Sequence, residues 1–384
     1  MPRRILILGA SYGSLLSTKL LMAGHDVTLV CRRKTADLIN SQGTEVRIKL
    51  RDEATHRSFH SRDLPGKVDA MPPEDVDVSR YDLVGLAMQE PQYNNHTIRV
   101  LMIKIAAAKL PCLSIMNMPP LPYLDRIPAL AKMDLREAYT NAGVWDRFEP
   151  GLMSLCSPDP QAFRPPDEGA NVLHVGLPTN FKAATFADPA HNALLRELEA
   201  DIDAVRVEGQ DVPVKLKVFD SLFVPLAKWS MLLTGNYRCI TPQAPRSIRD
   251  AVHGDLPLSR TIYEHVDAVA RRLGADPSDQ VPFEKYAKAA EGLLKPSSAA
   301  RAVESGAPYI ERVDLLLKLI SHQLDMPDAE IDRTVEIVDR KLDERIIPGW
   351  AARSGPSHRS AAGPRSPVGI MYSSTGSDGL WSPP

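Results

Sequence analysis

The sequence predicts a two-domain α/β protein, in which a doubly wound parallel sheet precedes an all-helical domain. With 384 residues the chain is long enough to bury two separate cores. Its first half alternates short apolar β-type runs with helical stretches, which is the pattern of a parallel sheet covered by helices. After about residue 215 the β-type runs disappear and only helical periodicity remains. We therefore expect one domain over residues 1–215 and a helical domain over residues 216–347.

The start of the chain predicts a β-α-β unit, the building block of a parallel sheet. Residues 3–8 form a short apolar run, and residues 12–23 carry leucines at helical spacing before Gly24 ends the helix. Residues 26–31 form a second apolar run. Further β-type runs lie at 81–88, 113–117, 172–177 and 204–208, with helical stretches at 96–110 and 190–202.

The second half of the chain predicts five helices and a disordered tail. The helical stretches span residues 219–234, 258–273, 283–294, 309–322 and 329–342. From Pro348 onward, 20 of 37 residues are Pro, Gly or Ser. Such a segment buries too little apolar surface to order itself, so we expect residues 348–384 to be disordered.

Composition excludes several classes of function. The net charge of −2 provides no basic field for nucleic acid or an anionic membrane surface. No apolar run approaches the ~20 residues that a membrane helix needs. The histidines and cysteines show no metal-ligand spacing, so we expect no metal site, no disulfide and a reducing cytoplasmic setting. The four cysteines are Cys31, Cys112, Cys156 and Cys239.

The turn after the first strand, Gly9-Ala10-Ser11-Tyr12-Gly13, fits two motifs. As G-x-S-x-G it would hold a hydrolase nucleophile, but in hydrolases that motif follows several earlier strands, whereas here it follows the first strand of the chain. As a variant of G-x-G-x-x-G it would cradle a dinucleotide pyrophosphate at the start of a helix. The β-α-β context favours the second interpretation, with residues Gly9 to Ser14 as the cofactor-binding turn. A tight turn without a ligand is the remaining alternative.

The end of the second strand indicates which dinucleotide binds. Proteins that prefer NAD usually place an acid there for the ribose 2′-hydroxyl, whereas this strand ends Cys31-Arg32-Arg33-Lys34. An arginine at this point accommodates a 2′-phosphate, and its planar fork suits phosphate geometry. The sequence therefore favours NADP(H), with Arg32 as the phosphate ligand. The alternative is that these basic residues only solvate a loop.

The segment ILGASYGSLLSTKLLMAGHDVTLVCRR resembles the start of the ketopantoate reductases, and the similarity continues more weakly to about residue 345. The resemblance implies an NADP-binding Rossmann-type domain followed by a 6-phosphogluconate dehydrogenase-like helical domain. It places Asn117 of SIMNMPP beside the nicotinamide, and Ser298 of PSSAARAVESG and Glu311 on the substrate. Arg32 falls on the arginine that binds the 2′-phosphate.

Two departures from the family pattern affect its functional residues. The glycine turn is one residue short, and Ser11 stands near the missing middle glycine. In the stretch that holds the family's catalytic lysine and an asparagine, Met231 and Gly235 occupy their places. Methionine cannot donate a proton. Lys228 lies three residues earlier and Asn236 one residue later, so a local shift could restore both roles.

We therefore expect an NADPH-dependent oxidoreductase that reduces a small C=O or C=N compound, carrying a carboxylate and belonging to specialised biosynthesis. Asn117, Ser298 and Glu311 would hold the substrate, with Lys228 as proton donor and Asn236 beside it. Reduction of an iminium needs no proton on oxygen, so the missing lysine favours C=N. The alternative is the same fold without redox activity, as a binding protein or a non-redox enzyme. An exposed helix face could serve a homodimer.

Overall fold

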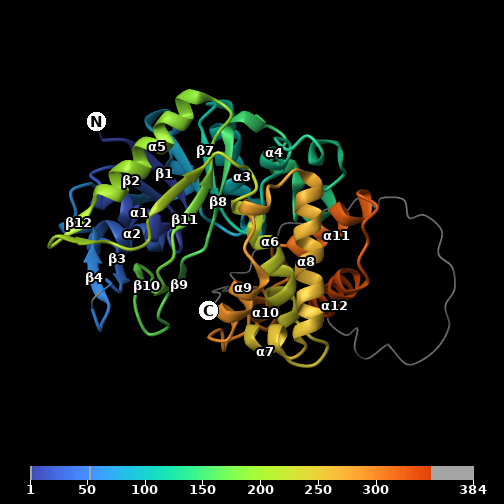
Figure 1. Ribbon diagram of the computed structural model, residues 1–384. Coiled ribbons are helices and arrows are strands. Elements are labelled where there is room, and N and C mark those ends of the chain that lie inside the picture. The colour runs from blue at the N-terminus through green and yellow to red at the C-terminus, as the bar shows by residue number, and fades with distance from the viewer. Residues whose placement is uncertain (1, 52, 347–384) are drawn as a thin grey trace.

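An eight-stranded sheet forms the centre of the N-terminal part of the protein (Figure 1), in a computed structural model that describes residues 2–51 and 53–346. The strand order is β14-β11-β8-β7-β6-β1-β2-β5. Six neighbouring strands of this sheet are parallel to one another, namely β8, β7, β6, β1, β2 and β5. Strand β11 runs antiparallel to β8 and parallel to β14. The strands are β1 (Arg4–Leu8), β2 (Asp26–Val30), β5 (Val68–Met71), β6 (Leu83–Leu86), β7 (Cys112–Ile115), β8 (Met153–Ser157), β11 (Phe181–Ala184) and β14 (Leu216–Phe219).

Two smaller sheets are attached to the large one. A four-stranded sheet has the order β4-β3-β10-β9, and a two-stranded ribbon joins β12 to β13. Their strands are β3 (Glu45–Ile48), β4 (Arg57–His60), β9 (Gln161–Phe163), β10 (Val172–Leu177), β12 (Arg206–Val207) and β13 (Gln210–Asp211). The expected strand 172–177 is therefore present, but it belongs to the second sheet.

Helices cover the sheet and then form the C-terminal part on their own (Figure 1). The first group is α1 (Gly13–Met22), α2 (Arg33–Gln42), α3 (His96–Ala107), α4 (Leu121–Leu124) and α5 (Pro189–Ala204). The second group is α6 (Lys228–Met231), α7 (Ile248–His253), α8 (Leu256–Leu273), α9 (Phe283–Ala290), α10 (Ser298–Glu304), α11 (Val313–Gln323) and α12 (Ala329–Ile346). The predicted fold class, a Rossmann-type sheet followed by a helical domain, is confirmed.

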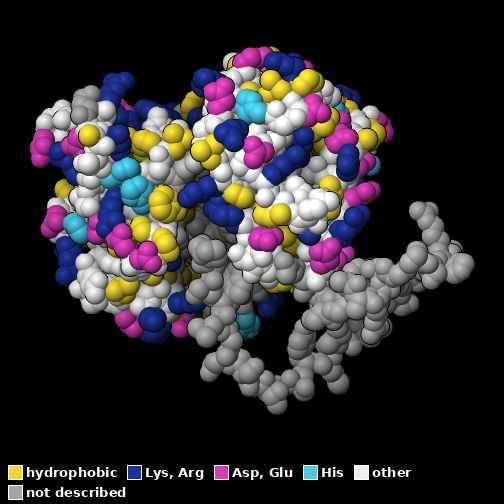
Figure 2. Space-filling model, turned by 90° about the horizontal axis from the view of Figure 1, so that it is seen from below, with side chains coloured by type: hydrophobic (Ala, Val, Ile, Leu, Met, Phe, Trp, Pro, Cys, Tyr) yellow, Lys and Arg dark blue, Asp and Glu magenta, His cyan; other side chains and the backbone are white. Residues whose placement is uncertain are grey.

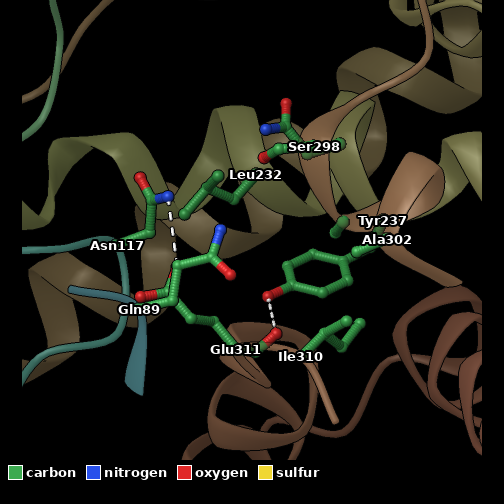
Figure 3. A pocket seen from close by; sticks show the side chains of 10 residues that line it. Gln89, Asn117, Leu232, Tyr237, Ser298, Ala302, Ile310 and Glu311 are labelled. Carbon is green, nitrogen blue, oxygen red and sulfur yellow. Dashed lines mark hydrogen bonds between the residues drawn. The ribbon is translucent and has the colours of Figure 1, made fainter. Parts of the chain in front are cut away.

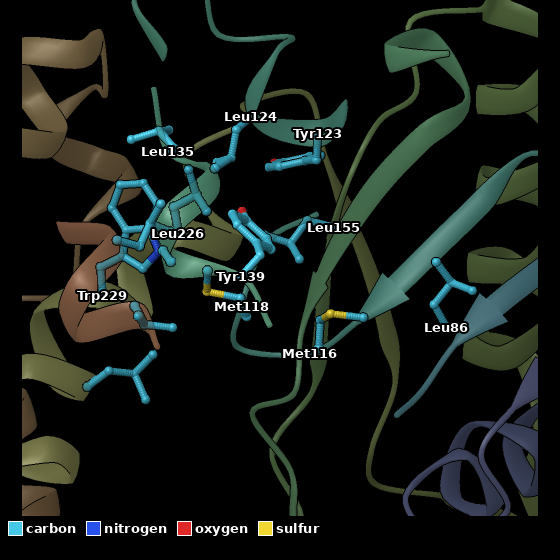
Figure 4. Close-up of a cluster of buried hydrophobic side chains, with 14 of the residues drawn as sticks. Leu86, Met116, Met118, Tyr123, Leu124, Leu135, Tyr139, Leu155, Leu226 and Trp229 are labelled. Atoms are coloured by element: carbon cyan, nitrogen blue, oxygen red, sulfur yellow. The ribbon is translucent and has the colours of Figure 1, made fainter. Parts of the chain in front are cut away.

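The large sheet is buried on both faces, as a parallel sheet requires. In β1, Ile5 and Ile7 point into one core with α1 and the second sheet, whereas Leu6 and Leu8 point into the other. This second core continues into the helical part without a break, through residues such as Trp229 (Figure 4). The shared core explains why the two parts form one folded body around a common cleft.

Several elements differ from the prediction in their bounds. Strand β14 extends the sheet to Phe219, beyond the expected boundary at residue 215, and the helix expected over 219–234 begins only with a 3₁₀ turn at Pro225. The expected strand 204–208 is reduced to the two residues of β12, because α5 continues to Ala204. The predicted tail, 348–384, lies outside the described residues.

The surface shows no segregation of charge on the face seen in Figure 2, where acidic and basic side chains are interspersed. This agrees with the near-zero net charge. Among the helices of residues 2–51 and 53–346, none has both the length and the apolar character needed to cross a membrane. The four cysteines are free, and three of them are buried.

A π-helical turn, Leu232–Asn236, follows α6 and sets the register of the helix at the cleft. The wider π turn keeps residues four apart, Lys228, Leu232 and Asn236, near one face of the helix. The hydroxyl of Tyr286 donates to the carbonyl of Met231 at 3.1 Å, beside the bulge. Gly235 makes this approach possible, because a Cβ there would lie 2.0 Å from the Tyr286 hydroxyl oxygen.

We predict that Gly235→Ala destabilises the protein by about 1–3 kcal/mol through overpacking, although alanine is normally the better helix former. Tyr286→Phe alone should cost about 1 kcal/mol for the lost hydrogen bond. It also removes the clashing oxygen, so the double variant should cost less than the sum of the two single variants. Urea unfolding of the wild type, the two single variants and the double variant measures these free energies. If the two single losses of unfolding free energy simply add in the double variant, the proposed packing is contradicted.

Candidate active site

The glycine turn lies at the carboxyl end of β1. From β1 the chain adds β2 and β5 on one side of the sheet and then β6 and β7 on the other, so the strand order reverses next to β1. Open α/β sheets bind ligands at such a switch point. Gly9 has φ +107°, and a Cβ there would lie 2.7 Å from the carbonyl oxygen of Ala87. A Cβ on Gly13 would lie 2.6 Å from Ile7 Cγ2. Both glycines are therefore required by the close passage of the turn over β1 and β6.

The other residues of the turn have distinct environments. The Ser14 hydroxyl is buried and donates to the carbonyl of Ala10 at 2.5 Å, so it closes the turn. Ser11 is exposed, and no side chain caps α1. The Tyr12 hydroxyl donates to the carbonyl of Pro160 at 2.7 Å, which ties the segment after β8 to the turn.

A polar pocket lies between the sheet and the helices (Figure 3). From the sheet, Gln89 follows β6 and Asn117 follows β7, both at the carboxyl ends of parallel strands. The remaining lining residues come from the π turn and its continuation, from α10, and from the segment before α11. They are Leu232, Asn236, Tyr237, Ser298, Ala299, Ala302, Ile310 and Glu311.

This pocket brings together four of the five residues predicted as catalytic, namely Asn117, Asn236, Ser298 and Glu311. Glu311 precedes α11 and is not on a helix, because the helix expected from residue 309 begins only at Val313. Gln89 and Tyr237 were missed. Gln89 follows a predicted strand end, which is a usable signal, whereas nothing local distinguished Tyr237.

Glu311 is the central ionisable group of the pocket. Asn117 Nδ2 donates to its Oε2 at 3.3 Å, and the backbone N–H of Glu90 lies 3.4 Å from Oε1. Burial raises the pKa of Glu311 to about 7; the bond from Asn117 opposes this and the nearby Glu90 carboxyl adds to it. The carboxyl therefore changes charge near neutral pH.

The position of Glu311 is fixed through its backbone by Tyr237. The Tyr237 hydroxyl donates to the Glu311 carbonyl at 2.5 Å and accepts from the Val313 N–H at 2.9 Å (Figure 3). Next to α10, Ser297 donates to the Asn236 carbonyl at 2.7 Å and accepts from the Ala300 N–H, so it caps the helix. Ser298 is exposed toward the pocket.

Lys228 lies at the edge of the cleft and is not one of the lining residues. Its ammonium donates to the Pro158 carbonyl at 2.8 Å and lies 3.7 Å from Asp159 Oδ1. Burial lowers the pKa of Lys228, while the charges of Asp159 and then Glu311 oppose that shift. Met231 packs against the cluster of α9 that contains Tyr286.

The three basic residues after β2 have different partners. Arg33 pairs with Asp75 at 2.9 Å and Glu74 at 3.6 Å. Arg32 has no carboxylate within 4.0 Å among the described residues, and neither has Arg164, which follows β9. Burial lowers the pKa of Arg164, and the positive charge of Arg32 lowers it further, so the two guanidinium groups are neighbours.

The sequence matches no protein-family profile and no curated protein. Solved structures match over nearly the whole chain. A putative ketopantoate reductase from Ralstonia solanacearum MolK2 has a TM-score of 0.64 at 18% identity, over 90% of this chain and 100% of that chain. A D-mandelate dehydrogenase, solved with NADH and anilino(oxo)acetate, has 0.60 at 12%, over 90% and 100%. A dimeric ketopantoate reductase from Staphylococcus aureus has 0.56 at 11%, over 89% and 99%. The chain therefore has the ketopantoate reductase fold.

We predict that Glu311 makes stability depend on pH. Its folded pKa of about 7 lies above the ordinary 4.5, so the folded protein retains a proton there that the unfolded chain loses. The stability from the protonated form is complete below pH 4.5 and is lost as the pH rises through 7. Relative to wild type, Glu311→Gln should gain up to about 3 kcal/mol in unfolding free energy between pH 5 and 8.

The control for this prediction is Glu304→Gln, which removes an exposed carboxyl at the end of α10. Its unfolding free energy should follow that of the wild type across the same pH range. Denaturant unfolding at each pH measures both variants. Parallel curves for Glu311→Gln and wild type would show that the Glu311 carboxyl is not perturbed.

Proposed function

We propose that the protein is an NADPH-dependent reductase of a small C=O or C=N compound. The observation that carries this proposal is the meeting of Asn117, Asn236, Ser298 and Glu311 in one pocket, although nearly two hundred residues separate the first from the last. The pocket residues Gln89 and Asn117 and the glycine turn all follow the carboxyl ends of the adjacent strands β6, β7 and β1, the edge where open α/β sheets bind dinucleotides. When bound, the nicotinamide cofactor would supply a hydride.

For the cofactor, Gly9 and Gly13 let the backbone of the turn come close to the pyrophosphate, and the uncapped start of α1 offers N–H donors. Ala10, Ser11 and Tyr12 complete the turn. The short loop still fits a pyrophosphate, since Ser11 remains exposed. Asn117, at the end of β7, would lie near the nicotinamide.

Arg32 and Arg164 support NADPH over NADH. Arg164 is half-buried without a carboxylate partner among the described residues, which is costly, and the positive charge of the exposed Arg32 adds to that cost, so an anion here would be stabilised. The 2′-phosphate is the anion that distinguishes the two cofactors at the end of the second strand. Arg164 was not identified from the sequence, because it reaches this position only through the pairing of the β9–β10 hairpin with β3.

For the substrate, Ser298, Asn117 and Glu311 provide hydrogen-bonding groups, and Asn236 lies on the same helix face as Lys228. If the substrate is a carbonyl compound, the alkoxide formed by hydride addition needs a proton, and Lys228 is an ammonium close enough for the Glu311 charge to raise its pKa. We further propose the cytoplasm as the site of action, consistent with four free cysteines. A homodimer is proposed by analogy with the dimeric structural neighbour.

The first test is a titration of the purified chain with NADPH and NADH, followed by nicotinamide fluorescence. Micromolar binding that favours NADPH is the expected result. No binding of either cofactor would contradict the proposal, and the same fold acting as a binding protein or a non-redox enzyme would replace it. The contact of Tyr12 with Pro160, which brings the segment after β8 onto the turn, is the feature that favours this second candidate.

We predict that Arg164→Ala and Arg32→Ala each weaken NADPH binding at least about tenfold and leave NADH binding unchanged, because each removes a charge-assisted bond to the 2′-phosphate. Arg33→Ala is the matched control, since Arg33 is already paired with Glu74 and Asp75. Equal losses for NADPH and NADH in the Arg164 variant would show that this arginine has no role in cofactor choice.

A further inference from the structure

The pocket contains one acidic group and no basic one. Of its ten lining side chains none is Lys, Arg or His, and Glu311 is the carboxyl. The buried carboxyl of Glu90 lies nearby, where it raises the pKa of Glu311. No cation lies within 4.0 Å of Glu311 in the part of the chain that the structure describes. The electrostatic field in the pocket therefore opposes an anionic ligand.

Lys228 does not change this balance. Its ammonium donates to the Pro158 carbonyl and faces Asp159, which also binds Lys182 at 3.0 Å. The ammonium of Lys228 is thus held outside the pocket, where it shares the Asp159 carboxylate with Lys182. A substrate carboxylate would meet Glu311 without a cation to hold it, which is an unfavourable arrangement for two buried charges.

The pocket also presents an acceptor that lacks a donor. Asn117 Oδ1 is buried and has no hydrogen-bond partner in the described protein. When Glu311 is ionised, the amide must direct its Nδ2 toward the carboxylate, as in the 3.3 Å hydrogen bond, which leaves Oδ1 without a donor. A buried acceptor left unpaired costs about 1–3 kcal/mol, so a ligand with an N–H or O–H group is expected there.

We infer that the pocket takes a protonated imine, a cation whose N–H donates to Asn117 Oδ1 and whose charge pairs with Glu311. The inference rests on the reductase function proposed above and specifies its substrate class. It replaces the carboxylate expected from the sequence, for which the pocket has no cationic partner.

The chemistry of such a step balances with the groups at hand. The imine carbon accepts a hydride from bound NADPH, and the π electrons of C=N⁺ move onto nitrogen, giving a neutral amine and NADP⁺. The amine then takes up a proton from water. No alkoxide forms, so this reaction needs no general acid, and methionine at position 231 does not prevent it.

The test uses the full chain loaded with NADP⁺ and two small probes, the pyrrolidinium cation and lactate, in calorimetric titrations. Pyrrolidine is the reduced form of the cyclic imine 1-pyrroline, and lactate is the reduced form of pyruvate. We expect pyrrolidine to bind and lactate not to bind. Glu311→Gln should weaken pyrrolidine binding at least tenfold, whereas the surface control Glu304→Gln should not alter it.

Turnover provides the second readout, with NADPH oxidation measured on 1-pyrroline and on pyruvate. Reduction of 1-pyrroline and not of pyruvate is expected. Tighter binding of lactate, no binding of pyrrolidine, or pyrrolidine binding insensitive to Glu311→Gln would each overturn the inference. If pyruvate alone is reduced, the reductase function stands and the imine inference falls. If wild type binds no NADPH, both fall.

Discussion

One additional residue in a helical turn fixes the geometry of the cleft. The π turn after α6 keeps Asn236 near the helix face that carries Lys228, and Met231, just before the turn, packs against the cluster of α9. The turn is stabilised where Gly235 leaves room for the Tyr286 hydroxyl to bond the backbone.

The charges of the cleft fall into two separate groups. On the helix side, Lys228 faces Asp159, and its ammonium is directed at a backbone carbonyl. Where the sheet meets the helical part, Glu311 before α11 and Glu90 after β6 lie close together without a cation within 4.0 Å of Glu311 among the described residues, and hydrogen bonds from Asn117 and the backbone partly compensate Glu311. This separation explains how one cleft can contain a lysine and still have an acidic pocket.

The sequence predicted most of what depends on local periodicity. The first β-α-β unit and the long helices α5, α8 and α12 lie where expected, because each has a repeating apolar face. Strands such as β3, β4 and β14 have only four residues each, too few for a recognisable apolar pattern, and β14 pairs with the distant β11. Of the site, the residues carried by the resemblance were found. Arg164 and Tyr237 were not, because their roles arise only from contacts across long stretches of chain.

The segment between β8 and β9 connects the two sides of the cleft. Pro160 accepts a hydrogen bond from Tyr12 on the sheet side, and Pro158 accepts one from Lys228 on the helix side. Two prolines in three residues restrict the backbone, so the segment acts as a stiff spacer that sets the width of the opening. Any widening of the gap between the two sides therefore requires at least one of these bonds to break. A three-residue strap that does not line the pocket thus restrains how far the two parts can separate.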